Sequence, residues 1–276
     1  MYNLTYSISL RPLYLQHTYY TFILLKELII AIQSYRQAHR FIVQHKLWKW
    51  ILLPGLVYAL LFSVSMYFFG KSAFHVIDYV NTITGLKKWL QHMQDGWLGF
   101  FFAFGGMTVW IILMFTYFSL FKHIWLIVGS PVFSYLSEKM ISIIEQKPFT
   151  FTTKQWLEDT VRGIQLSIRN GFWQLIYAVA LLILALIPIV GWIAPLIALM
   201  IEFYFYGFSM LDCSFERKHI SIANGNDFIS KHKGLAIGNG LVFYLMHVLL
   251  VVGWVLAPAY AVIAATLSLQ AQKQKS

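Results

Sequence analysis

Two apolar arms separated by a very short break constrain the fold of this chain more than any other feature. The first arm runs from Phe172 to Pro188, and the second ends at Asp212. As a helix that rises about 1.5 Å per residue, the first arm is about 26 Å long, close to the minimum for crossing a hydrocarbon core of about 30 Å. The break, Pro188–Gly191, is too short and too apolar for an exposed loop. We therefore expect an antiparallel helical hairpin that either spans the membrane twice or enters and leaves on one side.

The rest of the apolar sequence forms three further segments. Gly234–Leu269 has the same plan as the first hairpin, with its break expected at Ala257–Pro258. Ile51–Phe69 and Trp97–Val128 are expected to be transmembrane helices, and Gly129–Pro131 is expected to break the second one. Only 12% of the residues are charged, against about 25% in soluble domains. The chain is thus predicted to be an all-α membrane protein with two long transmembrane helices and two helical hairpins, re-entrant or short-spanning.

The N-terminal part of the chain predicts an amphipathic helix over Phe22–Val43. Lys26 and Glu27 interrupt any membrane span there, so we expect the helix to lie on the membrane surface. Its apolar stripe is expected to contain Leu25, Leu28, Ile32, Tyr35, His39 and Ile42. Residues 1–21 are expected to be a disordered extension, 22–270 a single membrane domain, and 271–276 a solvated tail.

The distribution of basic residues indicates an orientation. Six Lys and Arg residues precede or lie within the segment that ends at Trp50, and three lie in residues 70–96. The positive-inside rule then places both termini, residues 129–170 and residues 212–233 in the cytoplasm of a cell with the protein in its inner (plasma) membrane. The net charge of +10 is explained by contact with anionic membrane lipids, so we expect no nucleic-acid partner.

Several short motifs occur together in one order along the chain. They are Ser130-Pro131 with Glu138, Pro188–Gly191, Leu211-Asp212, Gly238-x-Gly240, and Pro258 with Ala264-Ala265-Thr266. In this order and spacing the chain resembles the family of the CysZ sulfate permeases and the etoposide-induced autophagy proteins, over roughly residues 24–269. The resemblance implies two long transmembrane helices, two hemi-penetrating hairpins, an inner-membrane location in bacteria, assembly into oligomers and, in the CysZ branch, sulfate uptake.

The resemblance also implies an anion-binding turn just before the first span. In the CysZ pattern this turn reads Gly-Leu/Ile-Arg-Arg, and the matching positions here are Lys46, Leu47, Trp48 and Lys49. The glycine is replaced by Lys46, the first arginine by Trp48 and the second by Lys49. Two ammonium groups at a helix N-terminus attract an anion, although they lack the planar donor pair of arginine. The alternative role of Lys46 and Lys49 is to anchor lipid phosphates.

Four other charged residues are candidates for a role in transport. Arg162 and Arg169 are seven residues apart and share a helix face, which forms either an anion-concentrating vestibule or a solvated or lipid-facing cytoplasmic surface. Glu202 lies inside an apolar run, where ionisable groups usually have a function. It either acts in transport, or is protonated or placed in an oligomer interface near a partner such as Lys122. Asp212 is interpreted as a helix cap or a pairing partner rather than a proton carrier.

The functional prediction follows from these features together. No nucleophile can be combined with a base, and the histidines have no ligand spacing, so we expect neither an enzyme nor a bound metal or cofactor. We expect a permease or channel for a small inorganic anion such as sulfate, assembled as a homo-oligomer. The alternative is a non-transporting membrane protein that acts in envelope or lipid organisation or in complex assembly. The altered anion motif and the absence of a visible polar stripe within the spans favour that alternative.

Overall fold

Every regular element in the part of the chain that the structure describes is a helix. The computed structural model describes residues 13–85, 99–149, 152–187, 189–249 and 251–273. The elements are α2 (Leu13–Gln44), α3 (Trp48–Thr84), α5 (Gly99–Ile144), α6 (Thr153–Ala185), the 3-10 turn η1 (Val190–Ile193), α7 (Ala194–Arg217), α8 (Ile222–Lys231), α9 (Lys233–Val248) and α10 (Val252–Lys273). The predicted all-α class is confirmed.

Four of these helical segments are long and apolar enough to cross a membrane. They are Trp48–Ile83, Thr153–Ala185, Val190–Arg217 and Val252–Gln272. A fifth apolar stretch, Met107–His123, belongs to α5. The chain is therefore a multi-pass membrane protein, as predicted.

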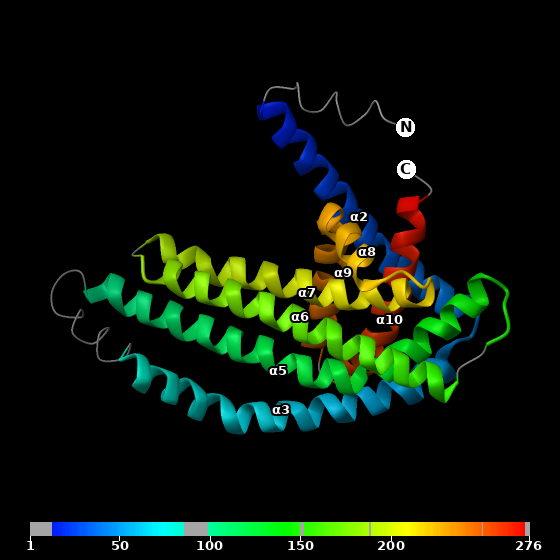
Figure 1. The fold of residues 1–276 in the computed structure, drawn as a ribbon, viewed down its shortest axis with the longest axis horizontal. Coiled ribbons are helices and arrows are strands. Elements are labelled where there is room, and N and C mark those ends of the chain that lie inside the picture. Colours follow the sequence, from blue (N-terminus) through cyan, green and yellow to red (C-terminus); the bar gives the residue numbers. More distant parts are fainter. Residues whose placement is uncertain (1–12, 86–98, 150–151, 188, 250, 274–276) are drawn as a thin grey trace.

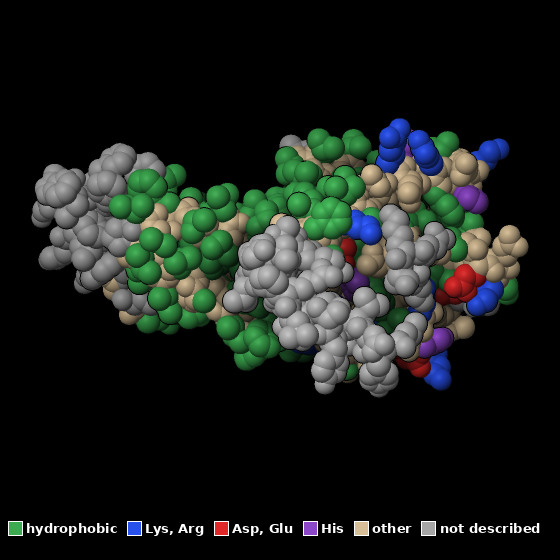
Figure 2. Space-filling view, turned by 90° about the horizontal axis from the view of Figure 1, so that it is seen from above, with side chains coloured by type: hydrophobic (Ala, Val, Ile, Leu, Met, Phe, Trp, Pro, Cys, Tyr) green, Lys and Arg blue, Asp and Glu red, His purple; other side chains and the backbone are tan. Residues whose placement is uncertain are grey.

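The helices form an elongated body (Figure 1). The helices α3 and α5 run side by side along its long axis, and the α6–α7 hairpin lies against α5. The helices α2, α8, α9 and α10 gather at the right-hand end of the body in Figure 1. On the face that Figure 2 shows, hydrophobic side chains cover the narrow half, and Lys and Arg side chains gather on the broad half.

The first hairpin turns where the sequence predicted. The helix α6 ends at Ala185, and η1 leads into α7 at Ala194. Ile189 has a φ of 70°, which is rare for a β-branched residue. A Cβ atom on Gly191 would lie 2.6 Å from the carbonyl oxygen of Ala185, so this glycine allows the turn to close against α6.

The second hairpin is present, but the prediction of its break at Ala257–Pro258 is wrong. The helix α9 ends at Val248 and α10 begins at Val252, so the reversal lies between these two residues. Pro258 lies inside α10. A proline removes one backbone donor, and α10 tolerates the loss because the neighbouring Ala257 and Ala259 are fully buried against other helices.

The physical cause of this second turn resembles that of the first. Val251 has a φ of 62°, again in the left-handed region. A Cβ atom on Gly253 would lie 1.7 Å from the carbonyl oxygen of Met246. Both hairpins therefore reverse through a β-branched residue with positive φ that is followed two positions later by a glycine packed on the preceding helix.

The two long helices exceed their predicted limits. The helix α3 continues to Thr84 instead of ending at Phe69. The expected break at Gly129–Pro131 is absent, because α5 continues through these residues to Ile144. Phe133, Leu136 and Met140 in this continuation are buried in the main core, so tertiary contacts keep it helical beyond the proline.

The amphipathic N-terminal helix is confirmed, but its buried face is offset from the predicted stripe. Tyr35 and Ile42 are buried as expected, whereas Leu25 and Ile32 are exposed. The buried face packs against α9 and α10. The helix begins at Leu13, so residues 13–21 are helical, and 1–12 lie outside the described residues. At the other end α10 runs to Lys273, and residues 274–276 lie outside.

Buried polar groups fix α2 on the second hairpin. The buried Glu27 carboxylate accepts a hydrogen bond from the Gly234 backbone N–H (3.1 Å) in the first turn of α9, and His232 Nδ1 lies 2.5 Å from its other oxygen. The hydroxyl of Tyr35 donates to the carbonyl oxygen of Asn239 (2.8 Å). Burial raises the pKa of Tyr35 well above its ordinary value, so the hydroxyl remains a donor.

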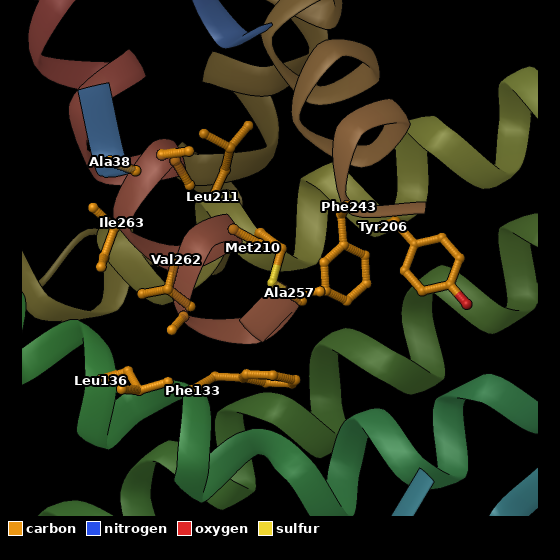
Figure 3. Close-up of a cluster of buried hydrophobic side chains, with 14 of the residues drawn as sticks. Ala38, Phe133, Leu136, Tyr206, Met210, Leu211, Phe243, Ala257, Val262 and Ile263 are labelled. Atoms are coloured by element: carbon orange, nitrogen blue, oxygen red, sulfur yellow. The ribbon is translucent and has the colours of Figure 1, made fainter. Parts of the chain in front are cut away.

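The main core joins the N-terminal helix, α5, α7 and the second hairpin (Figure 3). Side chains from all of these helices meet there, including Ala38, Phe133, Leu136, Tyr206, Met210, Leu211, Phe243, Ala257, Val262 and Ile263. A smaller cluster around Ile112 and Leu181 joins α5 to the first hairpin.

The helices α7 and α9 cross with their backbones in contact. A Cβ atom on Gly240 would lie 1.7 Å from the carbonyl oxygen of Phe203, and one on Gly207 would lie 1.8 Å from that of Ala236. Gly240, in the Gly238-x-Gly240 motif, therefore allows α9 to pack closely against α7. Small residues at such crossings are typical of membrane helices.

We predict that Gly240→Ala destabilises the protein by about 1–3 kcal/mol, because the added methyl group meets backbone that cannot move aside. Gly70→Ala on α3 is the matched control, since a Cβ atom there meets nothing within 4 Å. The measurement is thermal unfolding in detergent micelles followed by circular dichroism. Equal melting temperatures for the two variants would contradict the backbone contact.

Candidate functional site

The predicted anion-binding turn, Lys46–Lys49, joins α2 to α3. Lys46 has a φ of 52°, and the backbone N–H of Leu47 donates to the Ile42 carbonyl oxygen (3.0 Å). Leu47 is buried, whereas the side chains of Lys46 and Lys49 are exposed. We call this segment the basic turn. It combines two exposed ammonium groups with the free backbone N–H groups of a helix N-terminus.

Neither ammonium group of the basic turn has a carboxylate within salt-bridge distance among the described residues. Trp48 is half-buried against the main core, so its side chain serves packing. The next residue, Trp50, holds the Lys139 ammonium group 4.0 Å from its ring centroid, and Phe149 holds the same group at 5.0 Å. Cation–π contacts of this kind fix a lysine close to the turn.

Arg162 is not free to form an anion vestibule. Its Nε and Nη2 atoms donate to the two carboxylate oxygens of Asp212 at 2.9 Å and 2.7 Å. Its Nη1 atom donates to the carbonyl oxygen of Ile220 (2.8 Å). Asp212 is thus a pairing partner, and its cation is Arg162 on α6 rather than a neighbour in sequence. Each of the three nitrogen atoms of this guanidinium group therefore donates to a protein oxygen.

Arg169 has a different environment from Arg162, although the two residues are seven apart. Its Nη1 atom donates to Asn170 Oδ1 (3.3 Å), and its guanidinium carbon lies 5.6 Å from the ring centroid of Phe208. The two arginines are therefore held in separate contacts, and the structure does not bring them together.

Glu202 forms a buried ion pair with Lys122 inside one chain. Lys122 is fully buried, and only 3% of Glu202 is exposed. The carboxylate of Glu202 also accepts from Gln174 Nε2 (3.4 Å), and His123 Nε2 donates to Gln174 Oε1 (2.7 Å). The Lys122 ammonium group lies 4.4 Å from the ring centroid of Tyr206. The sequence suggested Lys122 as the partner, but in an oligomer interface.

A second charged cluster lies at the end of α7. Arg217 contacts Asp159, Glu138 (3.4 Å) and Glu216 (3.4 Å). Ser134 Oγ donates to Glu216 Oε2 (3.4 Å). This cluster was not predicted, because its members come from three helices, α5, α6 and α7, that are distant in sequence.

Together these groups are distributed along the contacts between α5, α6 and α7. We define the polar seam as Ser119, Lys122, His123, Ser130 and Ser134 of α5, Asp159, Arg162, Ser167, Asn170 and Gln174 of α6, and Glu202, Ser209, Asp212, Glu216 and Arg217 of α7. The expectation that the spans carry no polar stripe is therefore wrong.

Within the described residues, no group of three His, Cys, Asp or Glu side chains could hold a metal ion.

The comparison with family models identifies one match. The model described as Sulfate transporter CysZ/Etoposide-induced protein 2.4 matches residues 34–258. These residues include the basic turn and the polar seam. No curated protein matches the chain.

We predict that Lys122→Met destabilises the protein by about 3–5 kcal/mol, because it leaves the Glu202 carboxylate buried without a counter-charge. The double variant Lys122→Met/Glu202→Leu should recover most of that stability, since neither charge remains. Lys231→Met is the control, because the Lys231–Asp227 pair is largely exposed and is worth about 0.5 kcal/mol. Denaturant unfolding in micelles measures all three, and a double variant no more stable than Lys122→Met would contradict this role.

Proposed function

Because the chain belongs to the Sulfate transporter CysZ/Etoposide-induced protein 2.4 family, we propose that it is a permease or channel for a small inorganic anion such as sulfate. The observation that carries this proposal is the basic turn. Its two lysines are exposed at the N-terminus of α3, where the helix dipole and the free N–H groups favour an anion.

The character of the basic turn suggests how it handles the anion. Each lysine is a point charge rather than a planar donor pair, so binding should be weak and sensitive to salt. A weak site suits a protein that must release its substrate. The Trp48 side chain stands where the family pattern has an arginine, which lowers the selectivity for the tetrahedral sulfate ion.

The charged groups in the interior and those of the basic turn are proposed to have different roles. Lys122, Arg162 and Arg217 are each paired with carboxylates, so the polar seam of one chain offers no unpaired cation to an anion. We propose that the anion path lies between several copies of the chain, in a homo-oligomer whose members each supply a basic turn. Glu202 and Asp212 then serve the architecture, and Arg169 has no assigned part in the path.

A second candidate is a non-transporting membrane protein that organises lipids or a protein complex. The same internal pairing favours it, because a folded chain with neutralised interior charges needs no transported ion. Under this alternative Lys46 and Lys49 bind lipid phosphates. Neither candidate involves a reaction catalysed by the chain.

The orientation is also proposed. The Lys and Arg distribution supports cytoplasmic termini in an inner (plasma) membrane. The broad half of the molecule, which contains α2, α8, α9 and α10, would then face the cytoplasm. Labelling of single cysteines from each side of sealed vesicles, in a Cys213→Ser background, tests this orientation.

We predict that Lys46→Gln/Lys49→Gln weakens the apparent sulfate affinity about fivefold to tenfold, as expected for two charges at a helix N-terminus. Trp48→Arg should tighten binding, because a guanidinium group offers two parallel donors. Lys154→Gln is the control, since this exposed lysine pairs with Glu158 away from the turn.

The measurement is sulfate uptake into proteoliposomes, with oligomer size checked for each variant. Equal uptake by wild type and Lys46→Gln/Lys49→Gln would remove the basic turn from the transport mechanism. No uptake of any anion by the intact wild-type protein would instead support the non-transporting function.

A further inference from the structure

A small hollow opens between α5, α6 and α7 at one end of the polar seam. Its volume is about 20 Å³, which is room for one group of the size of a water molecule or a hydroxyl. Five side chains with a polar group line it, Thr116, Ser119, Gln174, Tyr177 and Glu202, and the rest of the lining is apolar. The hollow is therefore partly polar, and it is too small for a phosphate headgroup.

The hydroxyl of Ser119 lacks a hydrogen-bond partner among the residues that the structure describes. Ser119 is 94% buried, since only 6% of it is exposed. Its neighbour Thr116, one turn away, donates its hydroxyl hydrogen to the Ile112 carbonyl oxygen (2.7 Å). Buried polar atoms almost always have a partner, so Ser119 points to a bound polar group in the hollow.

The charge around the hollow selects an uncharged ligand. The Glu202 carboxylate is already balanced by Lys122, and a charged headgroup would add an unpaired charge in a buried place. A neutral hydroxyl adds none. It can accept a hydrogen bond from Ser119 and donate one to Glu202, whose partner besides Lys122 among the described residues is Gln174, at a long distance of 3.4 Å.

The rim of the hollow is apolar and faces outward. Leu120, Leu175 and Tyr177 line it and are each about 40% exposed. They lie on α5 and α6, within apolar stretches that cross or enter the membrane. A molecule that reaches Ser119 through this rim must therefore present a hydrocarbon body to the rim and a small polar head to the interior.

We propose that this hollow binds the hydroxyl head of an uncharged lipid alcohol, with Ser119 and Glu202 as its hydrogen-bond partners. The hydrocarbon part of the lipid lies along the exposed side chains of α5 and α6. Water offers the same hydroxyl chemistry from another source, and the experiment below separates the two. The site does not depend on anion transport, because it uses neither the basic turn nor a free cation.

The test is photocrosslinking in phosphatidylcholine vesicles. The probe is a photoactivatable diacylglycerol with a free hydroxyl, compared with the same lipid in which that hydroxyl is methylated. We expect the free alcohol to label peptides of α5 and α6 around the hollow about fivefold more than the ether, as for one additional hydrogen bond. Ser119→Ala should reduce labelling to the level of the ether.

Two further variants make the result specific. Ser63→Ala removes an exposed hydroxyl on α3 that is bonded to its own helix, and it should leave labelling unchanged. Ala178→Leu fills the hollow without altering Ser119, and it should abolish the preference for the free alcohol. Equal labelling by alcohol and ether in the wild type, or no effect of Ser119→Ala, would overturn the proposal and leave water as the occupant.

Discussion

Lys122 of α5 and Glu202 of α7 form a salt bridge that is buried between their helices. Taking both charges out of water costs several kcal/mol each, and their attraction offsets this only while they remain together. The register of α7 against α5 is therefore restricted to positions that keep the pair intact. Gln174 adds α6 to the same constraint through its bond to Glu202. Two further ion pairs restrict the position of α6 against α7. Arg162 pairs with Asp212, and Arg217 pairs with Asp159. A non-specific apolar contact would tolerate sliding, whereas this set of pairs does not.

The hairpins show what could be predicted from the sequence and what could not. The first break was found because a proline and a glycine interrupt an otherwise continuous apolar run. The second was placed at Pro258, although a proline in a well-packed helix removes only one hydrogen bond. The true signal is a repeat: Ile189-Val190-Gly191-Trp192 and Val251-Val252-Gly253-Trp254 occur at the two tips. In both, the glycine meets the carbonyl of the preceding helix. The effect of a proline on a helix was also overestimated at Gly129–Pro131, where a break was predicted and α5 continues.

The polar seam could be predicted only in part. Its members are spread over three helices, so that each helix shows isolated serines and single charges rather than a stripe. Glu202 and its partner Lys122 were identifiable because each is costly to bury alone. Arg217, Asp159 and Gln174 gave no comparable signal, since their partners are distant in sequence. The basic turn was found only through the family resemblance.

The structure separates two sets of cations, those with carboxylate partners in the interior and the exposed lysines at the start of α3. This separation is the physical basis for assigning architecture to the first set and anion handling to the second.

The most direct test of this separation is sulfate uptake by the double variant Lys122→Met/Glu202→Leu in proteoliposomes. The pair holds helices together and contributes no unpaired charge to an anion path. Uptake by the folded double variant should therefore equal that of the wild type at every sulfate concentration. Loss of uptake by a double variant that keeps its oligomer size and its cooperative unfolding would contradict the account, because it would show that the buried pair takes part in transport itself.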